Sequence, residues 1–521
     1  MEKEVSLAQQ AIDFMNGIIW SPALIVLCLG AGLFYSILTR FAQVRHFFEM
    51  WRLLFKGTDS EDGISSFQAL AVSLSGRVGM GNIAGVAAAI GFGGPGAVFW
   101  MWVVAFLGAS TAYVESTLGQ IYKERGQLTG QYRGGPAYYF EKCLGQKWYA
   151  VIFAIASIIA CGVFLPGLQA NGVVNALTQV TGEGVLVDTS AFGQVGQNRL
   201  IGIAVILIML GFIIFGGIKR IANFTQFVVP FMALGYIIMA LIIVFANFDQ
   251  IPTMVSLIIS DAFTPQAGFG AAIYLGVKRG VYSNEAGQGT GPHAAAAAEV
   301  DHPAQQGLVQ AFSVYVDTLF VCTATALMIL ITQQYNIQCM ESNFCEVTNS
   351  GAFIVAHVDE ATKISSPAFT QMAVSSMFGN FGQTFVALAS FFFAFTTILA
   401  YYYIAEVNVA YLGRLVKSGR AGLIFLIKVI IMAMVAYGAL NTEGYIWAMG
   451  DVGVGMMAWL NIVGILLIFF MGRPALKALR DYENQQKAQK GVEEKQYSFD
   501  PRALGIKNAT FWEQRYDEQQ R

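Results

Sequence analysis

Two stretches of the chain combine glycine with polar and charged side chains inside otherwise apolar segments. They run from Ser73 to Gly85 and from Gly276 to Pro292. Glycine destabilises a helix interior by about 1 kcal/mol relative to alanine, so several glycines within two turns favour unwinding. Unwound carbonyls can coordinate a cation, and unwound amides can hold a carboxylate. The two stretches therefore predict non-covalent binding of an ion and a zwitterion.

Close helix packing is the alternative explanation, because a pattern such as Gly81-x-x-x-Gly85 lets two helices approach each other. Packing does not account for the charged residues in the same stretches, which are Arg77, Lys278, Arg279 and Glu285. A charge near the centre of a bilayer costs at least about 2.5 kcal/mol and usually serves a function. Broken membrane helices are therefore the favoured interpretation.

Other polar side chains also stand in apolar surroundings. Gln169 lies near the end of one apolar segment, and Thr396 and Thr397 are adjacent in another. Hydroxyl and carbonyl oxygens are the ligands that small hard cations prefer, although threonine in a membrane helix often bonds to its own backbone. For five further charged residues, structural pairing is favoured over a role in proton transfer: Glu115, Asp317, Glu406, Lys428 and Asp451.

The elements that would position these residues are helices that cross a membrane. The chain has 521 residues, of which 55% are hydrophobic and 12% charged, and its mean hydropathy is +0.55. Soluble domains carry about 25% charged residues, so we expect lipid surroundings. Windows of about 20 apolar residues predict an all-α integral membrane protein with about 11 transmembrane helices: 18–39, 66–90, 95–121, 149–171, 199–217, 220–246, 268–297, 306–333, 380–408, 422–440 and 445–472.

The last ten predicted helices form two groups of five, each opened by a glycine-rich stretch. The predicted organisation is an N-terminal extracytoplasmic segment 1–17, an extra helix with its cytoplasmic loop 18–65, a first repeat 66–246, a second repeat 268–472 with an outside loop 334–379, and a tail 473–521. Lysine and arginine gather in alternate loops and in the tail, and the other loops hold only Lys3, Arg199 and Lys363. This bias predicts an outside N-terminus and a cytoplasmic C-terminus.

The remaining segments carry weaker signals. The tail is charged and poor in apolar residues, which is typical of a solvated, partly disordered segment. Cys339 and Cys345 share the outside loop and could pair if that loop faces an oxidising compartment. The net charge of −2 gives the protein no overall positive potential that would attract nucleic acid. We expect contact with membrane lipid and no obligate protein partner.

Five motifs make the chain resemble the alanine or glycine:cation symporter family, which are sodium-dependent transporters of bacteria and archaea. The motifs read GMGNIAGVA at 79–87, GGPGAVFWMW at 93–102, GGPAYY at 134–139, SNEAG at 283–287 and FTTIL at 395–399. The resemblance covers about residues 12–472. It implies a leucine-transporter-like fold, in which two inverted five-helix repeats follow one extra N-terminal helix.

The resemblance also implies a site between the helices at 66–90, 149–171, 268–297 and 380–408. The substrate-binding residues carried over by motif are Gly79, Gly81, Asn82, Gln169, Ser283, Asn284, Thr397 and Tyr401. The sodium candidates are Ser75, Gly79, Thr396 and Thr397. The implied activity is sodium-coupled symport of a small neutral amino acid, alanine or glycine, across the inner membrane of a prokaryote, with sodium co-transported and no enzymatic step.

The motifs depart from the family pattern at three places. Met80 stands where many relatives have threonine, Tyr401 stands where some have tryptophan, and the run Gly289–Pro292 differs from the commoner Gly-Ser-Ala-Pro. Any of these differences could reshape the pocket. The choice among alanine, glycine and glutamine, and between D and L forms, therefore stays open.

Two other classes of function stay open beside sodium symport. A proton-coupled permease would use Glu115, Glu285 or Asp317 as its carrier. A membrane-embedded enzyme is a distant third, because the apolar segments hold no His/Cys cluster and no convincing nucleophile–base set.

Overall fold

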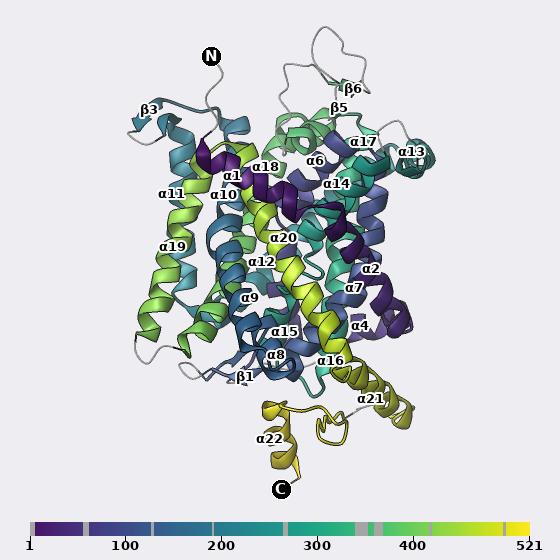
Figure 1. Ribbon diagram of the computed structural model, residues 1–521. Helices are drawn as coiled ribbons and strands as arrows, with labels where there is room; N and C mark the ends of the chain where they lie inside the picture. Colours follow the sequence, from purple (N-terminus) through teal and green to yellow (C-terminus); the bar gives the residue numbers. More distant parts are fainter. Residues whose placement is uncertain are drawn as a thin grey trace.

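The protein is a bundle of long helices running side by side, shown by a computed structural model (Figure 1). The structure describes residues 6–55, 62–126, 130–189, 192–263, 269–338, 353–358, 368–415, 419–492 and 496–520. Cys339 and Cys345 lie outside these described residues, so their pairing stays a prediction.

The helices are grouped by the segments of the predicted organisation, in which the two repeats stay a prediction. The N-terminal part holds α1 Leu7–Ile19, α2 Pro22–Leu38, α3 Ala42–Arg45 and α4 Phe47–Leu54. The first repeat holds α5 Ser66–Arg77, η1 Gly81–Gly85, α6 Val86–Gly93, α7 Gly96–Ile121, α8 Pro136–Lys142, α9 Lys147–Ile159, η2 Ala160–Phe164, α10 Leu165–Thr181, α11 Gln197–Ile214 and α12 Gly217–Ala246. A connection of η3 Phe248–Gln250 and α13 Ile251–Phe263 follows.

The predicted second repeat also opens with a broken helix. It holds α14 Phe269–Asn284, α15 Gly291–Ala297, α16 Pro303–Val314, η5 Tyr315–Cys322, α17 Thr323–Ile331, α18 Ala368–Gly413, α19 Arg420–Leu440 and α20 Glu443–Phe470. The tail holds α21 Pro474–Ala488 and α22 Thr510–Gln519. Three antiparallel strand pairs lie between helices: β1 Glu124–Arg125 with β2 Tyr132–Arg133, β3 Leu186–Thr189 with β4 Gly193–Gly196, and β5 Asn336–Gln338 with β6 Phe353–Ala356.

Within the described residues, eight helices are long and apolar enough to cross a membrane, or nine if the bent pair α1 and α2 forms one span. The predicted spans 66–90 and 268–297 are not among them, because each is broken into shorter helices. The all-helical membrane class is confirmed, and the count of eleven spans stays a prediction. α18 bends at Gly379, which has a non-helical φ of 57°. Residues 368–378, which the sequence analysis assigns to the outside loop, are therefore helical.

The two ends of the bundle differ in charge. α1, β3, β5 and β6 lie at one end, and α4, α8, β1, α21 and α22 lie at the other (Figure 1). The second end includes Arg45, Arg52, Lys123, Arg125 and Lys142, which belong to the loops whose basic residues set the predicted orientation. The alternation of basic loops along the sequence thus corresponds to the two ends of the folded bundle.

Small residues let the helices approach closely at the centre. α7 packs against α2, α14 and α16, while α10 packs against α18 and α19. A Cβ atom placed on Gly438 of α19 would lie 2.2 Å from the Cα of Gly167 on α10. The Asn171 amide adds hydrogen bonds of 2.9 Å to the carbonyls of Gly438 and Asn441. α10 and α19 therefore touch backbone to backbone.

The tail is not merely solvated. Tyr482, Phe499 and Trp512 are each at most 2% exposed. Trp512 donates through Nε1 to the Gln120 carbonyl at the end of α7, at 2.8 Å. Burying aromatic rings of this size stabilises a docked segment. The prediction of a solvated, partly disordered tail is wrong for these residues, because a few aromatic anchors outweigh a polar average.

Polar contacts fix the tail at the same end of the bundle. Glu483 pairs with Arg45 at 2.8 Å and with His46 at 2.9 Å. The Asp481 carboxylate lies 3.1 Å from His302, and the Tyr482 hydroxyl donates to Glu49 at 2.7 Å; these four partners come from α3, α4 and the start of α16. The tail thus joins elements that are far apart in the sequence.

Candidate functional site

The first glycine-rich stretch breaks as the sequence predicts. α5 ends at Arg77, Val78 takes a non-helical ψ of 85°, and the π-helical turn η1 begins at Gly81. The Thr397 hydroxyl on α18 donates to the carbonyl of Ser75 at 2.7 Å and lies 3.5 Å from that of Val78. Carbonyl and hydroxyl oxygens in one place form the kind of ligand set that a small hard cation prefers.

The second stretch breaks between Asn284, the last residue of α14, and Gly291, the first residue of α15. Gly287 and Gly289 have φ angles of 86° and 81°, and Glu285 has a φ of 57°. Glycine adopts such left-handed conformations easily, whereas they strain a larger residue by about 1–3 kcal/mol. Both predicted breaks are confirmed, and each is specified by residues at the break itself.

Glu115 on α7 holds the second break in place. Its carboxylate accepts the N–H groups of Gly287 at 3.3 Å and Gly289 at 3.1 Å, and the amide of Asn461 on α20 at 2.6 Å. Asn461 also donates to the Gly287 carbonyl at 2.9 Å. Buried backbone amides need partners, so these bonds replace the helical ones lost at the break. The charge pairing expected for Glu115 is not found among the described residues, and hydrogen bonds from neutral groups take its place.

Gln169 on α10 links the two breaks. Its Oε1 accepts the Met80 N–H at 2.9 Å, and its Nε2 donates to the Tyr282 hydroxyl of α14 at 3.2 Å. A Cβ atom at Gly79 would lie 2.9 Å from that same Oε1 and 2.5 Å from the Thr397 hydroxyl oxygen. Glycine at position 79 therefore lets α10 and α18 reach the broken backbone.

Asp317 brings two predicted site residues together. This aspartate lies in the π-helical segment η5. It accepts the Asn82 amide at 2.6 Å, the Ser283 hydroxyl at 3.0 Å and the Thr318 hydroxyl at 2.6 Å. Asn82 in turn accepts the Gly79 N–H through Oδ1 at 2.9 Å. The two broken helices thus converge on one carboxylate.

Two further predicted residues are Thr396, which bonds within its own helix, and Asn284, which stands at the second break. The Thr396 hydroxyl donates to the carbonyls of Phe392 and Phe393 on its own helix at 2.9 and 3.0 Å. The Asn284 side chain accepts the Ala286 N–H at 3.0 Å and so turns the chain at the second break. Among the sodium candidates, Thr396 is therefore the one whose hydroxyl bonds to its own helix, α18, and not to the backbone at a break.

The predicted side chains are closed off from solvent. Each is at most 2% exposed: Ser75, Asn82, Gln169, Ser283, Asn284, Thr396, Thr397 and Tyr401. Gly79 and Gly81 are buried as well. The cluster is therefore a closed interior site rather than an open cleft.

Charges near the site form their own pairs. Asp451 on α20 accepts Lys278 at 2.8 Å and Arg279 at 2.9 Å, both from α14. Glu406 on α18 pairs with Arg133 at 2.9 Å. The structural pairing expected for Asp451 and Glu406 is confirmed, and Lys278 and Arg279 hold α14 against α20.

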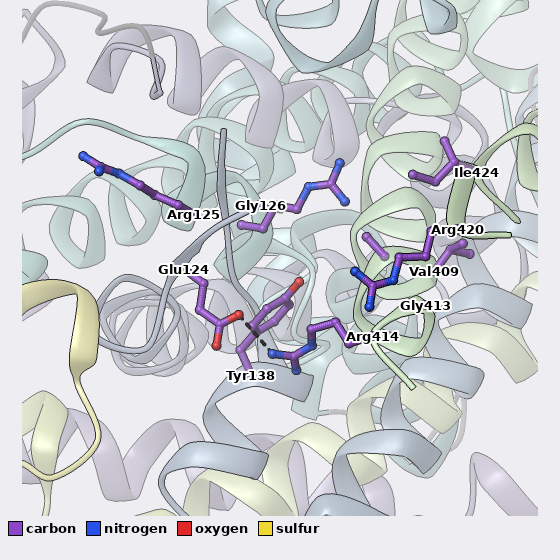
Figure 2. A pocket seen from close by; sticks show the side chains of 11 residues that line it. Glu124, Arg125, Gly126, Tyr138, Val409, Gly413, Arg414, Arg420 and Ile424 are labelled. Carbon is purple, nitrogen blue, oxygen red and sulfur yellow. Dashed lines mark hydrogen bonds and ion pairs between the residues drawn. The ribbon is translucent and has the colours of Figure 1, made fainter. Parts of the chain in front are cut away.

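A separate charged pocket of about 40 Å³ lies at the tail end of the bundle, between β1, α8 and the end of α18. Figure 2 shows Arg414 directed at Glu124, to which it is ion-paired at 3.0 Å. Arg414 also pairs with Glu141 at 2.7 Å. The pocket contains none of the residues at the breaks, so it is separate from the interior site.

Nearly the whole chain matches a known family. The model of the sodium:alanine symporter family covers residues 5–496. The chain belongs to the sodium:alanine symporter family. This is a family of membrane transporters rather than of enzymes, and its members place the chain in a multi-pass membrane setting.

Several members of the sodium:alanine symporter family are similar over nearly the full length. A putative sodium/proton-dependent alanine carrier protein, YrbD, of Bacillus subtilis (strain 168) is 54% identical over 96% of this chain and 97% of its own. A sodium/proton-dependent alanine carrier protein of Bacillus sp. (strain PS3) is 48% identical over 90% of this chain and 98% of its own. The probable sodium/glutamine symporter GlnT of Bacillus subtilis (strain 168) is 36% identical over 93% and 92%.

Two residues that organise the site in this symporter family member are not among the predicted substrate or sodium ligands: Asn461 is not singled out from the sequence, and Asp317 is named only as a paired charge or an alternative proton carrier. Asp317 and Asn461 each contact groups at the breaks from helices that the sequence does not link to them. Polar residues within apolar spans are the signal that both share. That signal identifies the residues without naming their partners.

Proposed function

We propose that the chain is a secondary active transporter that carries a small neutral amino acid, alanine or glycine, together with sodium into the cell. The observation that carries this proposal is the meeting of two broken helices at Gln169 and Thr397. In lipid, unwound backbone is tolerated only where it lines a protein cavity or packs in protein. Two unwound segments facing each other, rather than one, are typical of a transporter's central site.

The substrate carboxylate is assigned to the first break. The Gln169 amide oxygen accepts the Met80 N–H, so it stands in for one oxygen of a carboxylate in this closed arrangement. On substrate binding, Gln169 would hand this N–H to the carboxylate and hold the substrate with its own amide. Two relatives named as alanine carriers are 54% and 48% identical to the chain, and a probable sodium/glutamine symporter is 36% identical. These identities support alanine or glycine over glutamine.

The sodium ion is assigned to the carbonyls of Ser75 and Val78 and the hydroxyl of Thr397, which already converge. Gly79 and Thr396 complete the set of candidates from the sequence. One charge that crosses about 100 mV yields about 2.3 kcal/mol, and a tenfold sodium gradient adds about 1.4 kcal/mol. Together they support an accumulation of about a few hundred-fold.

Uptake into proteoliposomes tests this proposal. We expect radiolabelled alanine or glycine to accumulate when sodium is higher outside, and glutamine to accumulate much less. Collapse of the sodium gradient at constant pH should abolish accumulation. Alanine uptake of equal size with and without sodium would contradict sodium coupling, and a preference for glutamine would contradict the substrate assignment.

We also propose that the tail end of the bundle faces the cytoplasm of a prokaryotic cell. The basic loops at that end support this orientation. Asp188 of β3 and Lys147, the first residue of α9, are both exposed. β3 lies at the end of the bundle opposite to α8, the helix that precedes Lys147 (Figure 1). In an otherwise cysteine-free background, a membrane-impermeant maleimide added to whole cells should label Asp188→Cys and not Lys147→Cys. The reverse pattern would contradict the orientation.

Proton coupling is the second candidate function, since the names of two relatives join sodium and protons to alanine. An uncoupler that removes only the pH gradient separates the two candidates. Uptake that survives it requires sodium coupling, and uptake that collapses with it requires protons.

A further inference from the structure

Three carboxylates lie in the interior near one arginine. Glu115, Glu285 and Asp317 are each at most 2% exposed, and Arg77 on α5 is 1% exposed. Among the described residues, no Lys, Arg or His nitrogen lies within 4.0 Å of these carboxylate oxygens. An ionised carboxylate without a cation partner is costly to bury. Each of the three must therefore be stabilised by hydrogen bonds or carry a proton.

Glu115 and Asp317 are stabilised by hydrogen bonds. Glu115 accepts two backbone N–H groups and one amide, from Gly287, Gly289 and Asn461. Asp317 accepts one amide and two hydroxyl groups. Three donors thus compensate each of these two carboxylates for the water it loses on burial.

Glu285 is arranged differently. Its Oε2 accepts the Thr290 hydroxyl at 2.8 Å, and its Oε1 has no hydrogen-bond partner. The Tyr401 hydroxyl is a second hydrogen-bond partner of this carboxyl group. An unpartnered buried carboxylate oxygen loses the whole of its hydration. A proton on Oε1 removes the charge and turns that oxygen into a donor.

A small cavity lies beside the Glu285 carboxyl. It has a volume of about 10 Å³ and is lined by Glu285, Ser73, Thr290 and Tyr403, among others. This volume is at the lower limit for one water molecule, which needs about 10–15 Å³. The Ser73 hydroxyl also has no hydrogen-bond partner. Two unpartnered polar groups therefore face a space that one water can fill.

We propose that Glu285 is the residue that binds a co-transported proton, and that the cavity between Glu285 and Ser73 holds the water through which this proton is exchanged. The inference rests on the proposed transport function and adds a second coupling ion to it. The proton reaches Oε1 through this water while the site is open to the outside, and Oε1 holds it while the site is closed. It leaves to water when the second break moves and the carboxylate gains a hydration shell.

Charged and titratable groups surround Glu285 on several elements. They are Arg77 of α5, Tyr282 of α14, Cys161 of η2, Asp317 of η5, and Tyr401 and Tyr403 of α18. Arg77 donates to the Gln310 carbonyl at 3.0 Å and contacts the Ser313 hydroxyl through the same nitrogen, while its Nε and Nη2 have no hydrogen-bond partner.

Proton movement in proteoliposomes tests the inference directly. With sodium and alanine added outside, the purified wild-type protein should acidify the lumen, as reported by a trapped pH-sensitive dye. Glu285→Gln mimics the protonated form, so it should lower this acidification about tenfold or more and make alanine counterflow independent of pH between about pH 6 and about pH 8. Acidification at the wild-type rate in Glu285→Gln would overturn the inference.

The wild-type result separates this inference from the proposed function. Sodium-driven alanine uptake without any lumenal acidification would overturn proton binding and leave sodium symport intact. Absence of sodium-driven uptake would overturn the proposed function itself.

A labelling experiment keeps the test independent of whether variants fold. Dicyclohexylcarbodiimide reacts with protonated carboxyl groups in apolar surroundings, and mass spectrometry of the wild-type protein locates the adduct. We expect modification of Glu285 that increases as pH falls from about 8 to about 6. Glu115 and Asp317 serve as internal controls, because both are equally buried. Modification of either of them in preference to Glu285 would overturn the assignment.

Discussion

Thr396 and Thr397 are adjacent in the chain, but their hydroxyls have different partners. Thr396 bonds only within α18, whereas Thr397 also reaches the Ser75 carbonyl at the first break. This difference of one residue turns the side chain to another face of the helix. The pair therefore offers a matched comparison in which the chemistry is identical and only the direction changes.

Replacing each threonine by valine keeps the shape of the side chain and removes the hydroxyl. We expect Thr397→Val to raise the sodium concentration for half-maximal uptake about tenfold, a loss of about 1.4 kcal/mol. Thr396→Val should change this concentration about twofold or less, because its hydroxyl serves its own helix. Sodium titrations of alanine uptake measure both. Equal shifts in the two variants would contradict the assignment of Thr397.

Gln169 and Asn82 are the side chains that join the breaks to their surroundings. We expect Gln169→Ala and Asn82→Ala each to lower alanine uptake about tenfold or more, since each removes hydrogen bonds worth about 1–3 kcal/mol in the interior. Initial rates normalised to the amount of inserted protein measure the effect. Gln179→Ala, on the exposed side of α10, is the control. Near-normal uptake in both site variants would remove them from the site.

At the scale of elements, the second break depends on glycines with left-handed backbones. Gly289 has a φ of 81°, and a Cβ there would lie 2.6 Å from Pro136 and 3.0 Å from Asn461. We expect Gly289→Ala to destabilise the protein by about 2 kcal/mol or more, from backbone strain and overpacking, and to reduce uptake. Thermal unfolding in detergent measures the first effect.

Gly422→Ala provides the control for this element. Gly422 lies inside α19, and a Cβ there would meet no atom within 4 Å. Alanine favours a helix interior over glycine by about 1 kcal/mol, so this variant should be as stable as the wild type or slightly more stable. A Gly289→Ala protein that unfolds at the wild-type temperature would show that the break tolerates other backbone shapes.

The breaks could be predicted from the sequence because glycine affects the backbone conformation at its own position. Their density at 76–85 and 287–291 is a local property, and so is the hydropathy of the spans. The partners could not be predicted in the same way. Glu115 reaches backbone amides at Gly287 and Gly289, more than a hundred residues away, and Asp317 meets Asn82 across a similar distance. Such contacts depend on how helices pack, which periodicity does not encode.

At the scale of the whole molecule, the tail covers a lysine at the end of α7. Lys123 is buried, donates to the Ala298 carbonyl at 2.9 Å, and lies 4.6 Å from the ring centre of Phe511 and 5.5 Å from that of Trp512. Burial lowers the pKa of Lys123 to about 7, against the opposing pull of the Glu299 carboxylate. A polar average over the tail hides these aromatic contacts, which is why the sequence suggested a solvated segment.

Docking of the tail should therefore depend on pH. The docked state holds Lys123 with a lowered pKa, whereas the undocked lysine regains an ordinary pKa of about 10.4. Between about pH 7 and about pH 10 the undocked state binds more protons, so docking strengthens as the pH rises through this range and is constant below it. A nitroxide at Glu518→Cys should be more mobile at about pH 7 than at about pH 9 by electron paramagnetic resonance.

Lys123→Met is the control for this effect, since it keeps the apolar stem and removes the amine. The variant should show the same nitroxide mobility at both pH values. Wild-type mobility that does not change with pH would mean that the tail does not govern the hydration of Lys123.

The backbone contact between Gly167 and Gly438 has a consequence for which parts of the protein travel. The backbones of α10 and α19 touch at Gly167 and Gly438, and Asn171 of α10 donates hydrogen bonds to α19 and the residue that follows it. We therefore expect the two helices to move together rather than slide past each other. Gln169 belongs to this fixed wall. During a transport cycle we therefore expect the broken helices to move away from Gln169, which stays in place, and this movement to release the substrate.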